Sequence, residues 1–385
     1  MLIVGGGPAG SSLAARLAAA GRSVLVAEQS HFPRQKLCGE FVSPECLEKL
    51  DEFGVGERMM AAGARRIREM ILVGADGKSV ELPLSLLNAE VDFALGLSRA
   101  SLDAILLDRA RELGAEVLEG TRVASGTNFV AGRYQVQAMG PEGQKLAFNT
   151  RTVVNAAGRA SSFAANPTSR KTMIEMASQR DRLFGCKVHL RGIDPEAQIN
   201  GLYFFEGGYG GLAHIEDGLT NLCMLIDEKL LTDASQDRNE LLDRTMRRNP
   251  VAREILEDAV PDGSWLSTGP VSFGKSARPA DDSNEIRVGD AYAFIDPFTG
   301  SGILRALDGA DLIASIVNRF FDAGTVSTVN LRIECDRALR AVYSQKLRVS
   351  SILRRLATDG KHRSIVRNML AHVPGLARAI ARATR

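Results

Sequence analysis

The stretch Gly5-Gly6-Gly7-Pro8-Ala9-Gly10 stands near the start of the chain, directly after the apolar run Leu2-Ile3-Val4. In the pattern Gly-x-Gly-x-x-Gly the first glycine permits a tight turn, the second lets the backbone approach a pyrophosphate, and the third allows a helix to pack closely on a strand. Residues 11–20 read as that helix and residues 23–27 as a second strand. The stretch therefore predicts a βαβ unit of the Rossmann type, with phosphates bound at the helix N-terminus.

Glu28 follows the second expected strand, at about the distance from the glycines where Rossmann units carry an acid. A carboxylate in that place accepts hydrogen bonds from the ribose hydroxyls of an adenosine. Because the same carboxylate would repel a 2′-phosphate, Glu28 favours the adenosine of FAD or NAD over that of NADP.

A second glycine-rich stretch, near residue 300, distinguishes FAD from NAD. Residues 286–288 read as a strand leading to Gly289 and Asp290, where a carboxylate can accept hydrogen bonds from a ribityl chain, which NAD lacks. Residues 297–302 precede a helix expected over 303–320, whose N-terminus would stabilise the negative charge of a reduced flavin by about 0.3–2 kcal/mol. We therefore predict FAD, held by Gly5, Gly7, Pro8, Ala9, Gly10, Glu28, Gly289, Asp290, Pro297, Gly300, Ser301, Gly302 and Ile303.

The remaining elements divide the chain into interleaved domains. A helix at 102–113, a strand at 116–118 and a buried strand at 152–157 continue the parallel sheet. Short strands at 183–190, 201–205, 210–215 and 221–226 are typical of an antiparallel sheet, and a helix over 238–256 is broken at Asn249-Pro250. We predict an α/β fold in which a discontinuous, Rossmann-like FAD-binding domain (1–65, 95–165 and 272–325) carries an inserted antiparallel-sheet substrate domain (66–94 and 166–271) and a helical C-terminal region (326–385).

The composition of the 385 residues, 45% hydrophobic and 24% charged, is ordinary for a soluble globular protein. The five cysteines form no Cys-x-x-Cys pair, so the sequence predicts neither a disulfide framework nor a metal site. No apolar run approaches the ~20 residues that span a bilayer, and the start does not read as a secretory signal. These features predict a cytoplasmic location.

The C-terminal region is strongly basic. Residues 340–385 hold eleven Lys and Arg side chains against the single acid Asp359. From residue 363 onward apolar side chains recur at helical spacing between the arginines, which makes the segment a basic amphipathic helix pair. Such a segment fits an anionic membrane surface, an acidic carrier protein, or packing on its own domain with the arginines in water. Nucleic acid is not a predicted partner.

Four segments resemble the flavoprotein superfamily of p-hydroxybenzoate hydroxylase-type monooxygenases, geranylgeranyl reductases and flavin-dependent halogenases. They are residues 5–10, Arg99-x-x-Leu102-Asp103, residues 154–159 and residues 289–302, and the resemblance covers nearly all of residues 1–325. It implies FAD bound noncovalently, with Arg99 reaching the cofactor and Ala157-Gly158 near its adenosine end. A further segment, Arg34-x-Lys36-x-Cys38-Gly39-Glu40, resembles one that lies near the isoalloxazine in the reductase-like and halogenase-like members, which adds Arg34 to the expected FAD contacts.

Oxygenation, alkene reduction and, as a less favoured alternative, halogenation remain open on such a flavin. Our leading hypothesis is a monooxygenase that uses a flavin hydroperoxide on an aromatic or polyketide-like molecule, with Tyr209, His214 or His189 deprotonating a phenol. The alternative is an alkene reductase of the geranylgeranyl reductase type, acting on a prenyl or lipid-like substrate. There Cys38 would donate a proton and Lys36 would orient the substrate; in an oxygenase Lys36 would orient oxygen instead.

Two departures bear on these alternatives. Trp265 is the only tryptophan, so the two-tryptophan signature of the halogenases is absent. Prenyl reductases carry Tyr-x-Trp where this chain has Tyr209-Gly210-Gly211. Because no second Gly-x-Gly-x-x-Gly pattern exists to hold NAD(P)H, that reductant would bind transiently, or electrons would come from a separate carrier. A FAD electron-transfer protein is the non-enzymatic alternative.

Overall fold

The computed structural model describes residues 1–358 except 89, 131, 160–182, 234–237, 272, 276–284, 325 and 326. A five-stranded parallel sheet in the order β19-β12-β1-β2-β8 forms the centre of one half of the molecule, which we call the flavin half. The strands are β1 (Leu2–Val4), β2 (Leu25–Ala27), β8 (Glu116–Leu118), β12 (Val153–Asn155) and β19 (Ile286–Arg287). The Rossmann-like sheet expected from the sequence is therefore confirmed, and β19 joins it from the far end of the chain.

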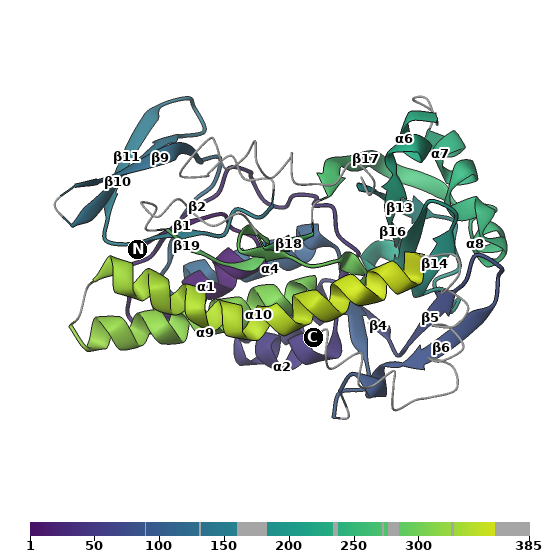
Figure 1. Cartoon of the computed structure of the whole chain (residues 1–385), viewed down its shortest axis with the longest axis horizontal. Helices are drawn as coiled ribbons and strands as arrows, with labels where there is room; N and C mark the ends of the chain where they lie inside the picture. The colour runs from purple at the N-terminus through teal and green to yellow at the C-terminus, as the bar shows by residue number, and fades with distance from the viewer. Residues whose placement is uncertain are drawn as a thin grey trace.

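Helices cover one face of this sheet (Figure 1). They are α1 (Pro8–Ala19), α2 (Pro44–Glu52), α3 (Gly56–Ala61), α4 (Arg99–Glu112), α9 (Gly302–Asp322) and α10 (Thr328–Thr358). Helix α1 packs against both α4 and α9, and α10 packs on the outer side of α9. Ile3 of β1 is buried among the apolar side chains of these helices. Helix α1 begins at Pro8, three residues before the expected start, because proline is well suited to the first helical turn.

The opposite face of the parallel sheet is covered by a small antiparallel sheet that the sequence analysis did not anticipate. It consists of β9 (Arg122–Val130), β10 (Arg133–Met139) and β11 (Lys145–Thr150), in the order β11-β10-β9. Exposed and buried residues alternate along β10. Its buried residues Tyr134 and Val136 pack against Leu2 and Val4, which point away from Ile3 as alternate residues of a strand must.

The second half of the molecule is a seven-stranded sheet in the order β17-β13-β16-β15-β14-β5-β6, at the other end of the molecule in Figure 1. All pairs are antiparallel except β14 with β5. Its strands are β5 (Glu69–Val73), β6 (Ser79–Pro83), β13 (Leu183–Arg191), β14 (Gly201–Phe205), β15 (Gly208–His214), β16 (Thr220–Asp227) and β17 (Val260–Val271). Two separate chain segments therefore build this sheet.

Short helices form a second core against this sheet: α6 (Glu228–Asp233), α7 (Arg238–Arg244) and α8 (Pro250–Ile255). Leu241 and Met246 pack there against Val188 and Met224 of the strands. The expected break at Asn249-Pro250 is confirmed, because Asn249 caps α8 through hydrogen bonds from Val251 N and Ala252 N. Strand β17 was not anticipated.

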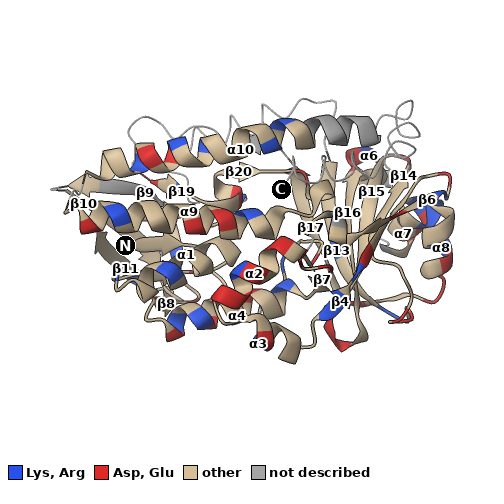
Figure 2. Ribbon diagram, turned by 90° about the horizontal axis from the view of Figure 1, so that it is seen from below, with Lys and Arg blue, Asp and Glu red and all other residues tan. Residues whose placement is uncertain are grey.

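A three-stranded sheet joins the two halves: β3 (Phe41–Val42), β7 (Ala94–Gly96) and β4 (Arg65–Ile67). Lys, Arg, Asp and Glu positions colour the ribbons of helices such as α2, α4 and α9, whereas the ribbons of the central strands are mostly free of them (Figure 2). Within the described residues no helix is long and apolar enough to cross a membrane, and no cluster of His, Cys, Asp or Glu could hold a metal ion. The basic segment beyond Thr358, with its predicted membrane or carrier contact, lies outside those residues.

Candidate functional site

The glycine turn after β1 has the geometry that its spacing predicts. Gly5 has φ +106°, and a Cβ there would lie 2.6 Å from the carbonyl oxygen of Ala156 on the neighbouring chain segment. A Cβ on Gly10 would lie 1.9 Å from the carbonyl oxygen of Gly5. The first glycine therefore makes the turn and the third brings α1 onto β1.

Two arginines approach the middle glycine. A Cβ on Gly7 would be 3.7 Å from Nη2 of Arg34 and 3.8 Å from Nη2 of Arg99. Arg99 donates to both carboxylate oxygens of Asp103 at 2.7 Å, and Nη1 of Arg34 lies 3.2 Å from the same carboxylate. Helix α1 has neither a side-chain cap nor an acid in its first turn. Its free N–H groups, its positive dipole end and two guanidinium groups together suit a pyrophosphate.

Glu28 is buried directly after β2, where the sequence predicted a carboxylate that binds the ribose. Its Oε2 accepts from Gly6 N at 2.7 Å and its Oε1 accepts from Ser30 N at 2.9 Å. These two bonds fix the carboxylate beside the glycine turn.

The second glycine-rich stretch lies against the first. Gly289 has φ +62°, and a Cβ on it would lie 2.9 Å from Cβ of Ala9 in the first turn of α1. Burial lowers the pKa values of Arg159 and Arg305, and the carboxylate of Asp290 opposes that shift in both. The two parts of the fingerprint, nearly 300 residues apart in sequence, thus form one site.

Helix α9 presents its N-terminus to this site. Asp296 accepts a hydrogen bond from Phe298 N at 3.1 Å, and Gly300 adopts a left-handed conformation with φ +62°. Neither a side-chain cap nor an acid occupies the first turn of α9, and Gly302 is exposed. Among the described residues, and apart from its own chain neighbours and helix backbone, a Cβ on Gly302 or on Gly158 would meet no atom within 4 Å. This open cradle beside an uncapped helix fits the pyrimidine edge of a flavin.

The segment from Arg34 to Glu40 crosses between the two halves of the fingerprint. Burial, followed by the charges of Arg34 and Arg99, lowers the pKa of Lys36, whereas Asp290 and Glu28 oppose the shift. Burial lowers the pKa of Arg99 as well, but Asp103 and the hydrogen-bonded Cys38 thiol outweigh it and raise that pKa. The structure therefore brings Lys36 and Cys38 to the cofactor residues.

Tyr209 lies on β15 where the seven-stranded sheet meets the flavin half. Its hydroxyl donates to Asp296 Oδ1 at 2.6 Å, and its ring packs edge-on against Phe298. Burial and the Asp296 carboxylate raise the pKa of Tyr209 well above its usual value. Tyr209 thus contacts the loop that precedes α9.

His214, at the end of β15, has both ring nitrogens occupied. Nδ1 lies 3.0 Å from Thr220 Oγ1 and Nε2 lies 3.0 Å from the carbonyl oxygen of Ala197. Burial lowers the pKa of His214. Its partners belong to the seven-stranded sheet and its loops rather than to the cofactor residues.

Sequence reasoning gave no role to Glu40 or Lys187, and it considered His189 only as a catalytic base. All three are buried, and His189 Nε2 lies 2.7 Å from Glu40 Oε2 while Lys187 Nζ pairs with Glu40 Oε1. One signal was available. Lys187 and His189 are polar residues two apart within the buried, mostly apolar part of their strand, so they face the same side of the sheet.

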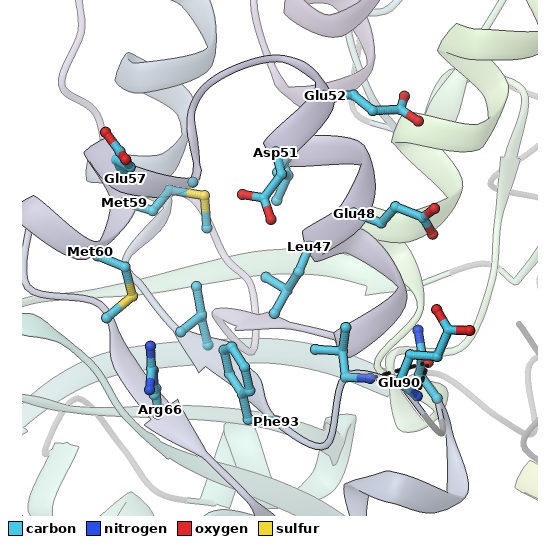
Figure 3. A pocket seen from close by; sticks show the side chains of 15 residues that line it. Leu47, Glu48, Asp51, Glu52, Glu57, Met59, Met60, Arg66, Glu90 and Phe93 are labelled. Atoms are coloured by element: carbon cyan, nitrogen blue, oxygen red, sulfur yellow. Dashed lines mark hydrogen bonds between the residues drawn. The ribbon is translucent and has the colours of Figure 1, made fainter.

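A surface groove of about 860 Å³ lies between α2, α3 and the β4–β7 strands (Figure 3). Leu47, Met59 and Phe93 point into it, and Glu48 and Glu57 stand at its rim. None of the predicted site residues lines this groove.

Comparison with known proteins agrees with this geometry. A FAD binding domain family model matches residues 1–181. Flavin-dependent halogenase armH1 of Armillaria mellea is 28% identical over 353 residues, which cover 82% of this chain but only 64% of that protein. Digeranylgeranylglycerophospholipid reductase of Methanosarcina mazei is 27% identical over 375 residues, covering 92% of this chain and 83% of the reductase.

Among solved structures, the myxobacterial chondrochloren halogenase CndH superposes with a TM-score of 0.76 at 21% identity, covering all of this chain and 90% of the halogenase. The fold, the FAD-binding domain and the residues assembled at the glycine turns agree. Residues 1–181 therefore match a FAD-binding domain, and the chain is similar to FAD-dependent enzymes that include a flavin-dependent halogenase and a digeranylgeranylglycerophospholipid reductase.

Proposed function

We propose that this chain is a FAD-dependent reductase that saturates a carbon–carbon double bond in a prenyl or lipid-like substrate, with Cys38 as the proton donor. The observation that carries the proposal is the position of the Cys38 thiol. The thiol lies beside Arg99, which approaches the phosphate turn. The backbone carbonyl oxygen of Cys38 accepts a hydrogen bond from Asn221 of the seven-stranded sheet. The thiol therefore sits where cofactor and substrate halves meet.

An apolar cluster lies between the seven-stranded sheet and the flavin half and suits a hydrocarbon substrate. Phe204, Tyr209, Leu225 and Val271 form a buried cluster against Phe294 and Phe298 of the flavin half. Gly211 replaces the tryptophan of prenyl reductases on the same face as Tyr209, since alternate residues of a strand share a face. A Cβ there would make only ordinary contacts, the nearest at 3.4 Å to Leu202, and the glycine gives this face less bulk at this position than a tryptophan would.

The chemistry assigns separate tasks to cofactor and protein. Bound FAD, reduced by NAD(P)H or by a carrier protein, would supply the hydride for one alkene carbon. The Cys38 thiol gives its proton to the other carbon and regains one from water, so the double bond gains two hydrogens in all. Arg34, Arg99 and Glu28 hold the cofactor, and the ammonium group of Lys36 orients a polar or anionic end of the substrate.

Oxygenation of an aromatic molecule is the second candidate, because the wall of Phe204, Tyr209 and Phe298 could also stack an aromatic ring. Such a reaction needs a base for the phenol. Tyr209 is not available as a base, because its raised pKa keeps the hydroxyl protonated and that hydroxyl donates to Asp296. The ring nitrogens of His214 are both engaged, and His189 is bound to Glu40. This shortage of bases favours reduction over our leading sequence hypothesis.

A single anaerobic experiment separates the two reactions. The enzyme is reduced with dithionite and mixed with a geranylgeranyl lipid, and the return of oxidised flavin absorbance is followed by stopped flow. We expect reoxidation with formation of saturated product, slowed about 100-fold in Cys38→Ala, as for loss of a general acid.

Cys335→Ala is the matched control, because Cys335 is a buried cysteine on α10. It should react at the wild-type rate. Reoxidation only after oxygen is added, with a hydroxylated aromatic product and no effect of Cys38→Ala, would contradict the proposal and support the monooxygenase.

A further inference from the structure

A cluster of buried charged side chains connects the seven-stranded sheet to the segment from Arg34 to Glu40. Glu40 is fully buried and has φ +55°, a left-handed conformation that costs a residue with a side chain about 1 kcal/mol or more. Its Oε1 accepts from Arg99 N at 2.7 Å and pairs with Lys187, while its Oε2 binds His189 at 2.7 Å. Glu40 therefore joins the start of α4 to strand β13.

Lys187 continues this attachment along the segment. Its ammonium group, only 1% exposed, donates to the carbonyl oxygen of Lys36 at 3.1 Å and to Oε1 of Gln35 at 3.2 Å, besides pairing with Glu40. All three hydrogens of the ammonium group thus have an acceptor. Burial alone would raise the pKa of Glu40, but the His189 hydrogen bond and the charge of Lys187 outweigh it and lower that pKa.

The neighbouring strand adds a third contact. Asn221 of β16 pairs in register with His189 of β13, and its Nδ2 donates to the carbonyl oxygen of Cys38 at 3.1 Å. The sheet thus holds the carbonyl groups of Lys36 and Cys38 and the carboxylate of Glu40, which are alternate residues of the segment. The backbone on both sides of the Cys38 thiol is fixed by the sheet that walls the substrate.

Stability alone does not account for this arrangement. Buried ion pairs are costly to desolvate, and well-packed apolar residues of similar volume are often as stable or more stable. Here the charged groups sit at the junction of two separately packed cores, and every contact ends on the segment that carries Lys36 and Cys38.

We propose that Lys187 and Asn221 are positioning residues, which act through the backbone of residues 36–40 to set the Cys38 thiol and the Lys36 ammonium group against the flavin. Glu40 connects them to Arg99 and the phosphate turn. The importance of the thiol rests on the proposed reductase function, but its placement matters for any reaction at this flavin.

The test compares Lys187→Met and Asn221→Leu, which keep side-chain size and remove the hydrogen bonds, with Val188→Ala. Val188 lies between Lys187 and His189 on β13 but faces the other core, so its truncation weakens the same strand without touching the segment. For each FAD-loaded variant we would measure thermal stability, the flavin absorption spectrum, the iodoacetamide alkylation rate of Cys38 by peptide mass mapping, and alkene-dependent reoxidation.

We expect Lys187→Met and Asn221→Leu to change Cys38 alkylation several-fold, to shift the flavin spectrum and to slow reoxidation by up to about 100-fold, as misplacement by about 1 Å can do. Val188→Ala should lower stability and leave the other readouts unchanged. The proposal is overturned if Lys187→Met and Asn221→Leu behave like Val188→Ala. If Lys187→Met does not fold, Asn221→Leu, which removes no charge, decides alone.

Failure of this proposal is distinguishable from failure of the proposed function. If wild-type enzyme does not reduce the alkene but both variants still alter Cys38 alkylation and the flavin spectrum, the positioning role stands and the reductase function falls. If the wild type reduces the alkene and both variants do so equally fast with unchanged alkylation, the reverse holds.

Discussion

Two glycines of the divided fingerprint, Gly10 and Gly302, differ in how closely other atoms surround them. The difference distinguishes a glycine needed for folding from one needed for cofactor binding. Gly10 is pressed against the chain itself, because a Cβ would lie 1.9 Å from the carbonyl oxygen of Gly5. That neighbour is backbone and cannot move aside. Gly302, by contrast, is exposed at the start of α9, and within the described part of the chain no atom beyond its own neighbours and helix backbone lies within 4 Å of a Cβ placed there. A cofactor bound at this helix start would meet that Cβ.

We therefore predict different effects for the same substitution at these two sites. Gly10→Ala should lower the free energy of unfolding of the FAD-free protein by about 1–3 kcal/mol or more, because overpacking displaces α1 from β1. Gly302→Ala should leave that stability nearly unchanged and weaken FAD binding at least about tenfold, a loss near 1.4 kcal/mol. Urea unfolding of the FAD-free protein and fluorescence titration with FAD measure the two quantities. A Gly302→Ala variant that binds FAD normally would show that the cofactor does not approach α9.

The residues of the cofactor site were predictable because their demands are local. A positive φ, a close backbone approach or an acid at a strand end leaves a short pattern in the sequence, as Gly5 and Glu28 do. Glu40 and Lys187 leave no such pattern, because they are 147 residues apart and meet only once both sheets have formed. His189 of that cluster was named in advance only as a candidate base, and Cys38 and Lys36, which the cluster contacts, were selected through a resemblance.

At the scale of elements, Asn249 shows how one side chain terminates and connects several of them. Its side-chain oxygen Oδ1 accepts hydrogen bonds from Val251 N at 3.1 Å and Ala252 N at 3.2 Å, which caps α8. Its amide donates at 2.9 Å to the carbonyl oxygens of Gly74 and Phe204, which ties α8 to the loop after β5 and to strand β14. Asn249 is fully buried, so none of these groups could turn to water instead.

Asn249→Ala should therefore lower the free energy of unfolding by roughly 3 kcal/mol, since it removes a cap and leaves buried polar groups without partners. Asn249→Ser keeps an acceptor for the cap and should lose less. Chemical unfolding of both variants checks the order. Equal losses would mean that the cap contributes little and that the two amide donors account for the effect.

Strand partners were harder to predict than strands. The limits of β8 and β14 agree with the sequence to the residue, because short apolar runs bounded by glycine mark them. The parallel pairing of β14 with β5 and the addition of β17 next to β13 depend on contacts between distant segments. Strand β10 alternates clearly between exposed and buried residues, so that strand was readable and was missed.

At the scale of the whole molecule, the chain forms two separately packed cores joined by few elements. The larger core lies between the parallel sheet and helices α1, α4 and α9, and the other lies under the seven-stranded sheet. Charged contacts around Glu40 and the aromatic contact of Tyr209 with Phe298 cross between the halves. The strength of these contacts therefore decides whether the two halves unfold together or separately.

All five tyrosines are buried, and four of them report on both halves: Tyr203 and Tyr209 in the seven-stranded sheet, Tyr292 and Tyr343 in the flavin half. Burial, as the first cause in each case, raises all four pKa values, that of Tyr292 to about 12. The folded state thus holds these protons more tightly than the unfolded chain, whose tyrosines titrate near pH ~10. Each tyrosine's contribution is fully present below that pH and is lost above it, by up to about 1.4 kcal/mol per pH unit.

We accordingly predict a steep alkaline unfolding transition. Ultraviolet absorbance of tyrosinate should stay low past pH ~10 and then rise together with the loss of the far-ultraviolet circular dichroism signal. One shared step means that both halves unfold as a unit, and two steps mean that the contacts at Glu40 and Tyr209 do not couple them. Tyr292→Phe removes one raised pKa from the flavin half and should move the midpoint of that half to higher pH. Gradual tyrosinate formation with intact circular dichroism would contradict the burial of these four hydroxyls.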